Sequence, residues 1–200
     1  MFISVIIGGR LGYVLFYNFT YYLDYPLEIL KVWEGGMSFH GALCGIILGI
    51  FLFCKKNNNS ILLMADLGSL TAPLGIFLGR IANFLNQELV GRKTEFFISI
   101  KYPNEEIYRH LSQIYEALFE GLIPLIILTI LHFKFNLKSG SLGGVFLINY
   151  GIVRFLIEFT RQPDLQIGLK FSYFSQGQIL SIPMIIGGML ILNHVYREKN

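Results

Sequence analysis

Charge is scarce in this sequence. Of its 200 residues only 14% are charged and 54% are hydrophobic, and the mean hydropathy is +0.56. An average soluble domain, by comparison, carries about 25% charged residues. So few charges cannot cover a surface that faces water, which excludes an ordinary soluble domain. We therefore predict an integral membrane protein.

Basic blocks and cysteines are scarce as well. The net charge is +3 and the longest basic run is the pair Lys55–Lys56, so nucleic-acid binding is excluded. Cys44 and Cys54 lie ten residues apart on one expected helix. This spacing separates their backbones by roughly 15 Å, too far for a disulfide. Because no metal-ligand spacing occurs, we predict no metal site and treat both cysteines as small apolar fillers.

Long apolar segments, in contrast, are abundant. We predict transmembrane helices near the roughly 20 residues that a bilayer requires, over residues 1–17, 40–54, 61–86, 114–133, 142–160 and 178–196. The first segment has no charged flank before it and no small-residue cleavage site after it, so it is interpreted as a span and not as a signal peptide. The predicted fold class is all-α: a polytopic integral membrane protein with about six transmembrane helices, in a single domain over residues 1–200.

The distribution of lysine and arginine predicts the orientation in the membrane. The connections 55–60 and 134–141 each carry two lysines and no acidic residue. In the connections 18–39 and 87–113, acidic residues match or outnumber the basic ones. Because the unopposed positive connections alternate along the chain, we place them, Met1 and the C-terminus in the cytoplasm. The longer connections then lie outside.

Polar residues gather toward the outer ends of the expected helices. They are Arg10, Tyr13, Tyr17, His40, Arg80, Asn83, Asn86, Glu116, Glu120, Tyr150, Arg154, Glu158, Gln176 and Gln178. A charged residue at the centre of a span costs about 3 kcal/mol on an insertion scale and marks a functional or paired site by default. The pattern therefore predicts one polar cavity that opens to the outer leaflet. A transporter, the competing hypothesis, would need polar lining on both sides of the midplane or a site at it.

A purely structural interpretation of single residues stays open. Arg154 and Glu158, spaced i, i+4, could simply pair along one helix face. Arg80 could extend its side chain to the nearby membrane interface. Close packing between helices is the expected role of four glycine pairs, namely Gly8–Gly9, Gly35–Gly36, Gly143–Gly144 and Gly187–Gly188.

Six blocks, in order along the chain, resemble those of the bacterial phosphatidylglycerol–prolipoprotein diacylglyceryl transferases, a family of integral-membrane enzymes. They read GGRLGYVLFYN at 8–18, VWEGGMSFHG at 32–41, GRIANFLNQELVGR at 79–92, RHLSQIYEALFEG at 109–121, YGIVRFLIEFTRQPD at 150–164 and GQILSIPM at 177–184. The resemblance implies transfer of the diacylglyceryl group of phosphatidylglycerol to the lipobox cysteine of a preprolipoprotein. A thioether forms and glycerol phosphate leaves. No cofactor is implied.

The resemblance also implies which residues act. The catalytic set is His40, Tyr150, Arg154 and Glu158. The set that binds phosphatidylglycerol is Arg10, Arg80, Asn83, Glu88 and Gly91. His40 would act as general base toward the thiol or orient it. Arg154 and Arg80 would hold the phosphate, with Glu158 orienting Arg154.

The implied setting is the bacterial cytoplasmic (inner) membrane, with the active site facing the outer leaflet on the periplasmic side and the C-terminus in the cytoplasm. The implied partners are phosphatidylglycerol, the lipobox segment of preprolipoproteins and membrane lipid.

Two features depart from the family pattern. The family's His-Gly-Gly is His40-Gly41-Ala42 here. The family also has a further transmembrane helix, with a functional tyrosine, before the block at 8–18. We therefore expect the chain to be truncated at its N-terminus relative to the family, or its start to be misassigned. An inactive scaffold with the same fold stays the alternative to an active enzyme.

Overall fold

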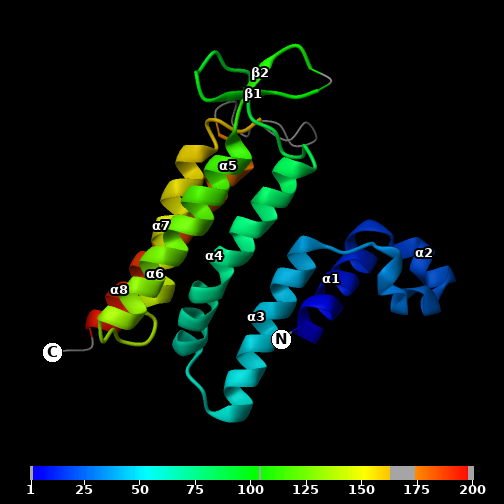
Figure 1. The fold of residues 1–200 in the computed structure, drawn as a ribbon. Helices are drawn as coiled ribbons and strands as arrows, with labels where there is room; N and C mark the ends of the chain where they lie inside the picture. Colours follow the sequence, from blue (N-terminus) through cyan, green and yellow to red (C-terminus); the bar gives the residue numbers. More distant parts are fainter. Residues whose placement is uncertain (1, 104, 163–173, 198–200) are drawn as a thin grey trace. The chain divides into compact units, whose positions relative to one another are not determined.

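Helices dominate the computed structural model of the chain (Figure 1). It describes residues 2–103, 105–162 and 174–197, apart from the side chains of Phe39 and His40. Within these residues, every element longer than three residues is helical, which confirms the all-α fold class. The chain divides into two compact units, Met1–Met64 and Ala65–Asn200.

The first unit is a pair of helices joined by an irregular segment. Its helices α1 (Phe2–Tyr17) and α3 (Phe39–Asn57) pack against each other. The short elements α2 (Phe19–Asp24), η1 (Pro26–Leu30) and η2 (Val32–Glu34) lie between them in the chain. The six-residue α2 and the two 3-10 turns fall in the connection that the sequence places outside the membrane.

Glycine allows α1 and α3 to approach closely. A Cβ atom on Gly8 would lie 2.8 Å from the Cα atom of Gly45 on the other helix. Such backbone contact is how helices associate where lipid removes the hydrophobic driving force. The predicted packing role holds for Gly8 but is wrong for Gly35 and for Gly187, where an added Cβ would meet nothing within 4 Å. Gly35 instead has a φ of +86°, a turn conformation that suits glycine.

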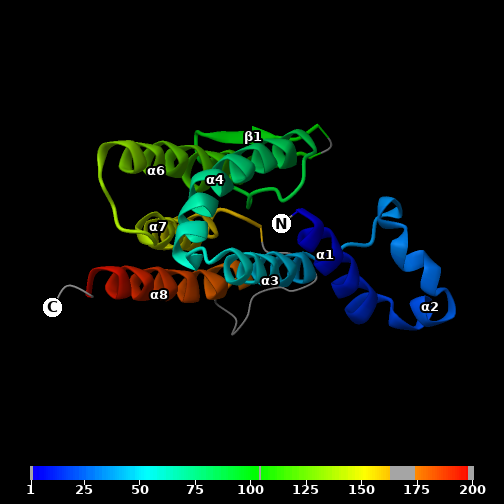
Figure 2. The ribbon, with the colours of Figure 1, turned by 90° about the horizontal axis from the view of Figure 1, so that it is seen from below.

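The second unit contains long helices and a β-hairpin. In chain order its helical elements are α4 (Ile61–Leu85, which starts in the first unit), α5 (Ser112–Glu116), the π-helical turn η3 (Ala117–Leu122), α6 (Ile123–Lys134), α7 (Ser141–Ile157) and α8 (Gln176–Arg197). Figure 2 shows α7 and α8 side by side. Glycine again sets this approach, because a Cβ on Gly188 would lie 2.7 Å from the carbonyl oxygen of Gly144.

Three helical stretches of the described chain are long and apolar enough to cross a membrane: Ile61–Leu85, Ser112–Lys134 and Gln176–Arg197. Phe2–Tyr17 and Ser141–Ile157 are shorter apolar helices. These stretches confirm a polytopic membrane fold. A helix also occupies each of the other predicted spans, and the count of about six membrane crossings stays a prediction.

The connection between α4 and α5 carries secondary structure that the sequence interpretation did not predict. Strands β1 (Ser99–Lys101) and β2 (Tyr108–His110) form an antiparallel hairpin, which lies beyond the ends of α4 and α5 (Figure 1). Arg109 holds the hairpin closed, because its guanidinium donates hydrogen bonds to both carboxylate oxygens of Glu105. This bond also lowers the pKa of the Glu105 carboxyl below its usual value.

A buried carboxylate fixes the start of α7. Asp66 of α4 accepts hydrogen bonds from the backbone N–H groups of Gly140 (2.6 Å) and Gly143 (2.8 Å). These are donors that a helix leaves unsatisfied at its N-terminus, where the helix dipole also favours a negative charge. Asp66 therefore ties α7 to α4, the two helices that carry the arginines of the candidate site.

Candidate functional site

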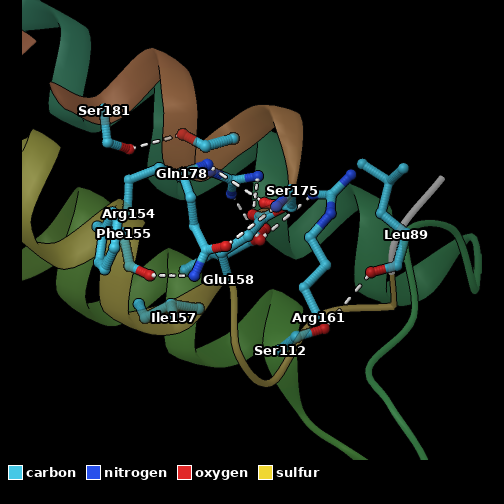
Figure 3. A network of polar contacts seen from close by, with 12 residues as sticks. Leu89, Ser112, Arg154, Phe155, Ile157, Glu158, Arg161, Ser175, Gln178 and Ser181 are labelled. Carbon is cyan, nitrogen blue, oxygen red and sulfur yellow. Dashed lines mark hydrogen bonds and ion pairs between the residues drawn. The ribbon is translucent and has the colours of Figure 1, made fainter. Parts of the chain in front are cut away.

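Six charged side chains of the second unit form one buried group, which we call the arginine–glutamate cluster. Its members are Arg80 of α4, Glu116 of α5, Glu120 of η3, Arg154 of α7, Glu158 at the end of α7, and Arg161 just beyond it. Figure 3 shows Arg154, Glu158 and Arg161 together, near the first turn of α8. The cluster joins three predicted site residues that lie far apart in the sequence: Arg80, Arg154 and Glu158.

Arg154 uses its planar guanidinium as a fork. One terminal nitrogen, Nη1, donates hydrogen bonds to Oε1 of Glu116 (2.7 Å) and of Glu120 (3.2 Å). The other, Nη2, lies 2.6 Å from Oε2 of Glu158, one helical turn further along α7. The side chain of Arg154 is 12% exposed. A compact point charge such as a lysine ammonium could not contact carboxylates on both sides in this way.

Arg80 faces the same carboxylates from α4. Its Nε lies 3.0 Å from Oε2 of Glu116, and its Nη2 lies 3.5 Å from Oε2 of Glu120. Neither of these Oε2 atoms has a hydrogen-bond partner among the described residues. The contacts of Arg80 with the two glutamates are therefore ion pairs and not hydrogen bonds, because its N–H bonds are not directed at these oxygens. The side chain of Arg80 is 18% exposed and is therefore more accessible than that of Arg154, the other arginine that contacts both Glu116 and Glu120.

Glu116 is the centre of the cluster. Besides Arg154 and Arg80, it is contacted by Nη1 of Arg161 at 3.3 Å. Its side chain and that of Glu120 have no exposed surface. A buried ion carries a desolvation cost of several kcal/mol, which is offset only by well-placed partners. Glu116, with three guanidinium neighbours, is such a compensated ion.

Local sequence explains why the two glutamates face α4 and α7. A π turn spans Ala117–Leu122 and ends two residues before Pro124, which has no N–H to donate to the backbone carbonyl of Glu120. At Gly121 an added Cβ would lie 2.7 Å from Cβ of Phe77, so only a residue without a side chain allows η3 to lie this close to α4. Isolated π turns within helices occur frequently at functional sites.

Neighbouring backbone also shapes the cluster. Gly91 forms a β-bridge with Arg161, and a Cβ on Gly91 would collide with the carbonyl oxygen of His110. On the other side, a Cβ on Gly177 would lie 2.8 Å from Oε2 of Glu158. Two glycines thus let the segments around Arg161 and Glu158 close over the charged groups.

The remaining predicted residues of this unit lie around the cluster. Tyr150 is half-buried on α7, within electrostatic reach of Glu120 and Arg154. Asn83 is half-buried on α4, and its backbone carbonyl accepts a hydrogen bond from the backbone N–H of Glu88 (2.8 Å). The Glu88 side chain is exposed. The roles of these residues in catalysis and lipid binding stay predictions.

Arg10, predicted to bind lipid, is buried in the first unit as the centre of a different network. Its guanidinium donates to the carbonyl oxygens of Glu28 (2.7 Å), Ile29 (2.9 Å), Gly35 (2.5 Å), Lys31 (3.1 Å) and Gly36 (3.2 Å). These bonds hold the segment between α2 and α3 against α1. The geometry therefore assigns Arg10 a role in organising this segment, while direct contact with lipid stays a prediction.

His40 lies in the first turn of α3, also in the first unit. Ser38 caps this helix, because its side-chain oxygen accepts the backbone N–H of Gly41 at 3.2 Å, which is the usual capping geometry. The side chain of His40 is outside the described part of the structure. Its predicted role as base or orienter of the thiol stays a prediction.

Sequence reasoning missed three members of this site as functional residues: Glu116, Glu120 and Arg161. The signal was present for the first two, because acidic side chains within a membrane span are expensive and need partners. Among the described residues, no group of three or more His, Cys, Asp or Glu side chains is placed to hold a metal ion. The three glutamates of the cluster are turned toward arginines.

Buried arginines within a membrane fold mark a functional site by default, and guanidinium groups are well suited to bind the phosphate of an anionic lipid. The family model described as prolipoprotein diacylglyceryl transferase matches residues 1–194. The chain belongs to this family.

Relatives support the same family. The phosphatidylglycerol–prolipoprotein diacylglyceryl transferase of Ehrlichia canis is 50% identical over 195 residues, which cover 95% of this chain and 75% of that protein. The protein of the same name from Vibrio parahaemolyticus is 47% identical over 198 residues, covering 98% of this chain and 72% of the relative. That from Rickettsia bellii is 46% identical over 193 residues, covering 95% and 73%.

Proposed function

We propose that this chain transfers the diacylglyceryl group of phosphatidylglycerol to the thiol of the lipobox cysteine in preprolipoproteins. The product is a thioether, and glycerol phosphate is released. The single observation that carries this proposal is the arginine pair Arg80 and Arg154, held by shared glutamates in a site with little exposed surface. Family membership over residues 1–194 supports the same reaction.

The reaction needs stabilisation of negative charge on a phosphate. The sulfur of the lipobox cysteine attacks the glycerol carbon that bears the phosphate, so that a C–S bond forms and the C–O bond breaks. The electron pair of that bond leaves with the phosphate oxygen. Arg80 and Arg154 would stabilise this developing charge, since guanidinium groups pair with phosphate bidentately and act strongly where water is excluded. Glu158, 2.6 Å from Arg154, would keep that arginine in position.

The thiol must lose its proton for the sulfur to attack. We propose His40 as the base, or as the group that orients the thiol, on the strength of its place in the block at 32–41 that resembles the family. Tyr150, Asn83, Glu88 and Gly91 would complete the site around the headgroup and the reacting carbon.

The proposal is tested in host cells depleted of their own diacylglyceryl transferase and expressing this protein from its native gene. Membranes are incubated with phosphatidylglycerol and a lipobox peptide, and mass spectrometry detects the diacylglyceryl thioether. We expect the cysteine peptide to be modified and a matched serine peptide to stay unmodified. His40→Gln should insert normally and lose the activity. An unmodified cysteine peptide would reject the function, and normal turnover by His40→Gln would reject the histidine as base.

We further propose that the site faces the outer leaflet of the bacterial cytoplasmic membrane and that the C-terminus is cytoplasmic. The lysine-bearing connections 55–60 and 134–141 support this orientation. Alkaline phosphatase, which is active only outside the cytoplasm, should be inactive when fused after Asn200 and active when fused after Glu106. Green fluorescent protein at the same positions should show the opposite pattern. Reversal of both patterns would place the site on the cytoplasmic side.

A further inference from the structure

Among the described residues, the arginine–glutamate cluster is electrically balanced. Three guanidinium groups face three carboxylates, and none of the side chains is more than 18% exposed. Balance is a physical requirement here, because an uncompensated charge in a water-poor site is strongly unfavourable. Any further charge that enters the cluster therefore needs its own compensation.

The proposed substrate brings such a charge. The phosphodiester of phosphatidylglycerol is a monoanion, and the proposed function places it against Arg80 and Arg154. Arg154 already donates hydrogen bonds to Glu116 and Glu120 through Nη1, so the phosphate must share these N–H donors, and Arg80 forms ion pairs with the same two carboxylates. The loaded cluster would hold four negative groups against three positive ones, unless one negative group is neutralised.

Glu120 is the carboxylate held most weakly. Its closest guanidinium atoms lie at 3.2 Å and 3.5 Å, whereas those of Glu116 lie at 2.7 Å, 3.0 Å and 3.3 Å. Glu158 is closest of all to its partner, at 2.6 Å. The Oε2 atoms of all three glutamates are buried and have no hydrogen-bond partner among the described residues, so the longer guanidinium distances are what distinguish Glu120. Glu120 is therefore the member of the cluster that loses least when its negative charge is removed.

The surroundings of Glu120 support the same choice. In the described part of the chain, the charged and titratable groups that act on Glu120 are Arg80 of α4, Glu116 of α5, and Arg154 and Tyr150 of α7. When phosphate takes over N–H donors from the two arginines, their attraction for Glu120 weakens, while the repulsion from Glu116 remains. An added phosphate charge increases that repulsion.

We propose that Glu120 takes up one proton when phosphatidylglycerol binds, which frees guanidinium donors for the phosphate and keeps the cluster neutral. This inference rests on the proposed function, because it needs the phosphate to bind at Arg80 and Arg154. The proton comes from water on binding, and it returns to water when the phosphate has left. Glu120 is then a positioning residue that acts through the two arginines.

The test is calorimetry of dioctanoyl phosphatidylglycerol binding to the detergent-solubilised protein in two buffers, Pipes and Tris, whose ionisation enthalpies differ. The difference between the binding enthalpies in the two buffers, divided by the difference between their ionisation enthalpies, gives the number of protons taken up. We expect about one proton per lipid in the wild type, and a dissociation constant that rises about tenfold per pH unit where the free carboxylate is ionised. Glu120→Gln, a neutral isostere of the protonated carboxyl, should bind with no proton uptake and no such pH dependence.

Glu106→Gln is the matched control, since Glu106 is exposed in the hairpin, and it should behave as the wild type. The inference would be overturned if Glu120→Gln took up as many protons as the wild type. It would also be overturned if the wild type took up no proton. Absence of proton uptake in the wild type overturns the inference even if the variant fails to fold. An enzyme that modifies the lipobox peptide without proton uptake would leave the proposed function intact. Proton uptake without any transfer would support the inference and reject the function.

Discussion

Arg154→Lys is expected to lose nearly as much transferase activity as Arg154→Ala, although lysine keeps the positive charge. The guanidinium reaches Glu116 and Glu120 through Nη1 and Glu158 through Nη2. A lysine ammonium is one charge point and cannot make both sets of contacts or grip a phosphate bidentately. Two lost charge-assisted hydrogen bonds, each worth about 1.5–3 kcal/mol, correspond to a decrease of roughly 100-fold or more in kcat/KM.

The measurement is the initial rate of diacylglyceryl transfer to a lipobox peptide as a function of phosphatidylglycerol concentration. Arg197→Lys serves as control, because Arg197 is exposed at the end of α8 and its replacement should leave the rate unchanged. The Tm of each variant separates loss of activity from loss of folding. If Arg154→Lys kept most of the wild-type kcat/KM, only the charge of Arg154 would matter, and the fork geometry would have no functional role.

The helices were predictable because each follows from a local property of the chain. Apolar runs of bilayer length mark the stretches Ile61–Leu85 and Gln176–Arg197, and the structure ends them close to the predicted residues. The hairpin of β1 and β2 was not predictable in this way. Its strands have three residues each, and their pairing depends on Arg109, which also donates to Gly91 and to Gln162 of a distant segment.

The candidate site was predictable in part. Polar residues at matching depth in different helices pointed to Arg80, Arg154 and Glu158 as neighbours. The same reasoning noticed Glu116 and Glu120 but did not make them the centre of the site. Their direction depends on the π turn and on the close approach of Gly121 to Phe77, and no periodicity of the sequence indicates these features.

Arg10 shows a second limit of sequence reasoning. An arginine within an apolar helix needs partners, and the resemblance implied only that Arg10 belongs to the set that binds phosphatidylglycerol. The structure shows that backbone carbonyls of the irregular segment from Glu28 to Gly36 accept its hydrogen bonds, while contact with lipid stays a prediction. Carbonyl directions in such a segment follow from its turns, among them Gly35 with its positive φ, and not from the identity of its side chains.

Glu116→Ala is expected to lower both the stability and the activity of the enzyme severely. Arg80, Arg154 and Arg161 all contact this carboxylate, and its removal leaves a buried excess of positive charge. Removing one partner of a buried ion pair costs about 3–5 kcal/mol, against about 0.5 kcal/mol or less for a surface substitution. Glu106→Ala in the exposed hairpin is the control for the loss of a glutamate side chain.

Unfolding of the detergent-solubilised protein, followed by circular dichroism during titration with sodium dodecyl sulfate, measures the free energy difference. Glu116→Gln separates charge from shape, because it keeps the volume of the side chain and removes only its negative charge. We expect it to be nearly as unstable as Glu116→Ala, since compensation of the three arginines is the property that both variants lose. A Glu116→Gln variant as stable as the wild type would mean that Glu116 acts through packing, and that the arginines are compensated by Glu120 and Glu158 alone.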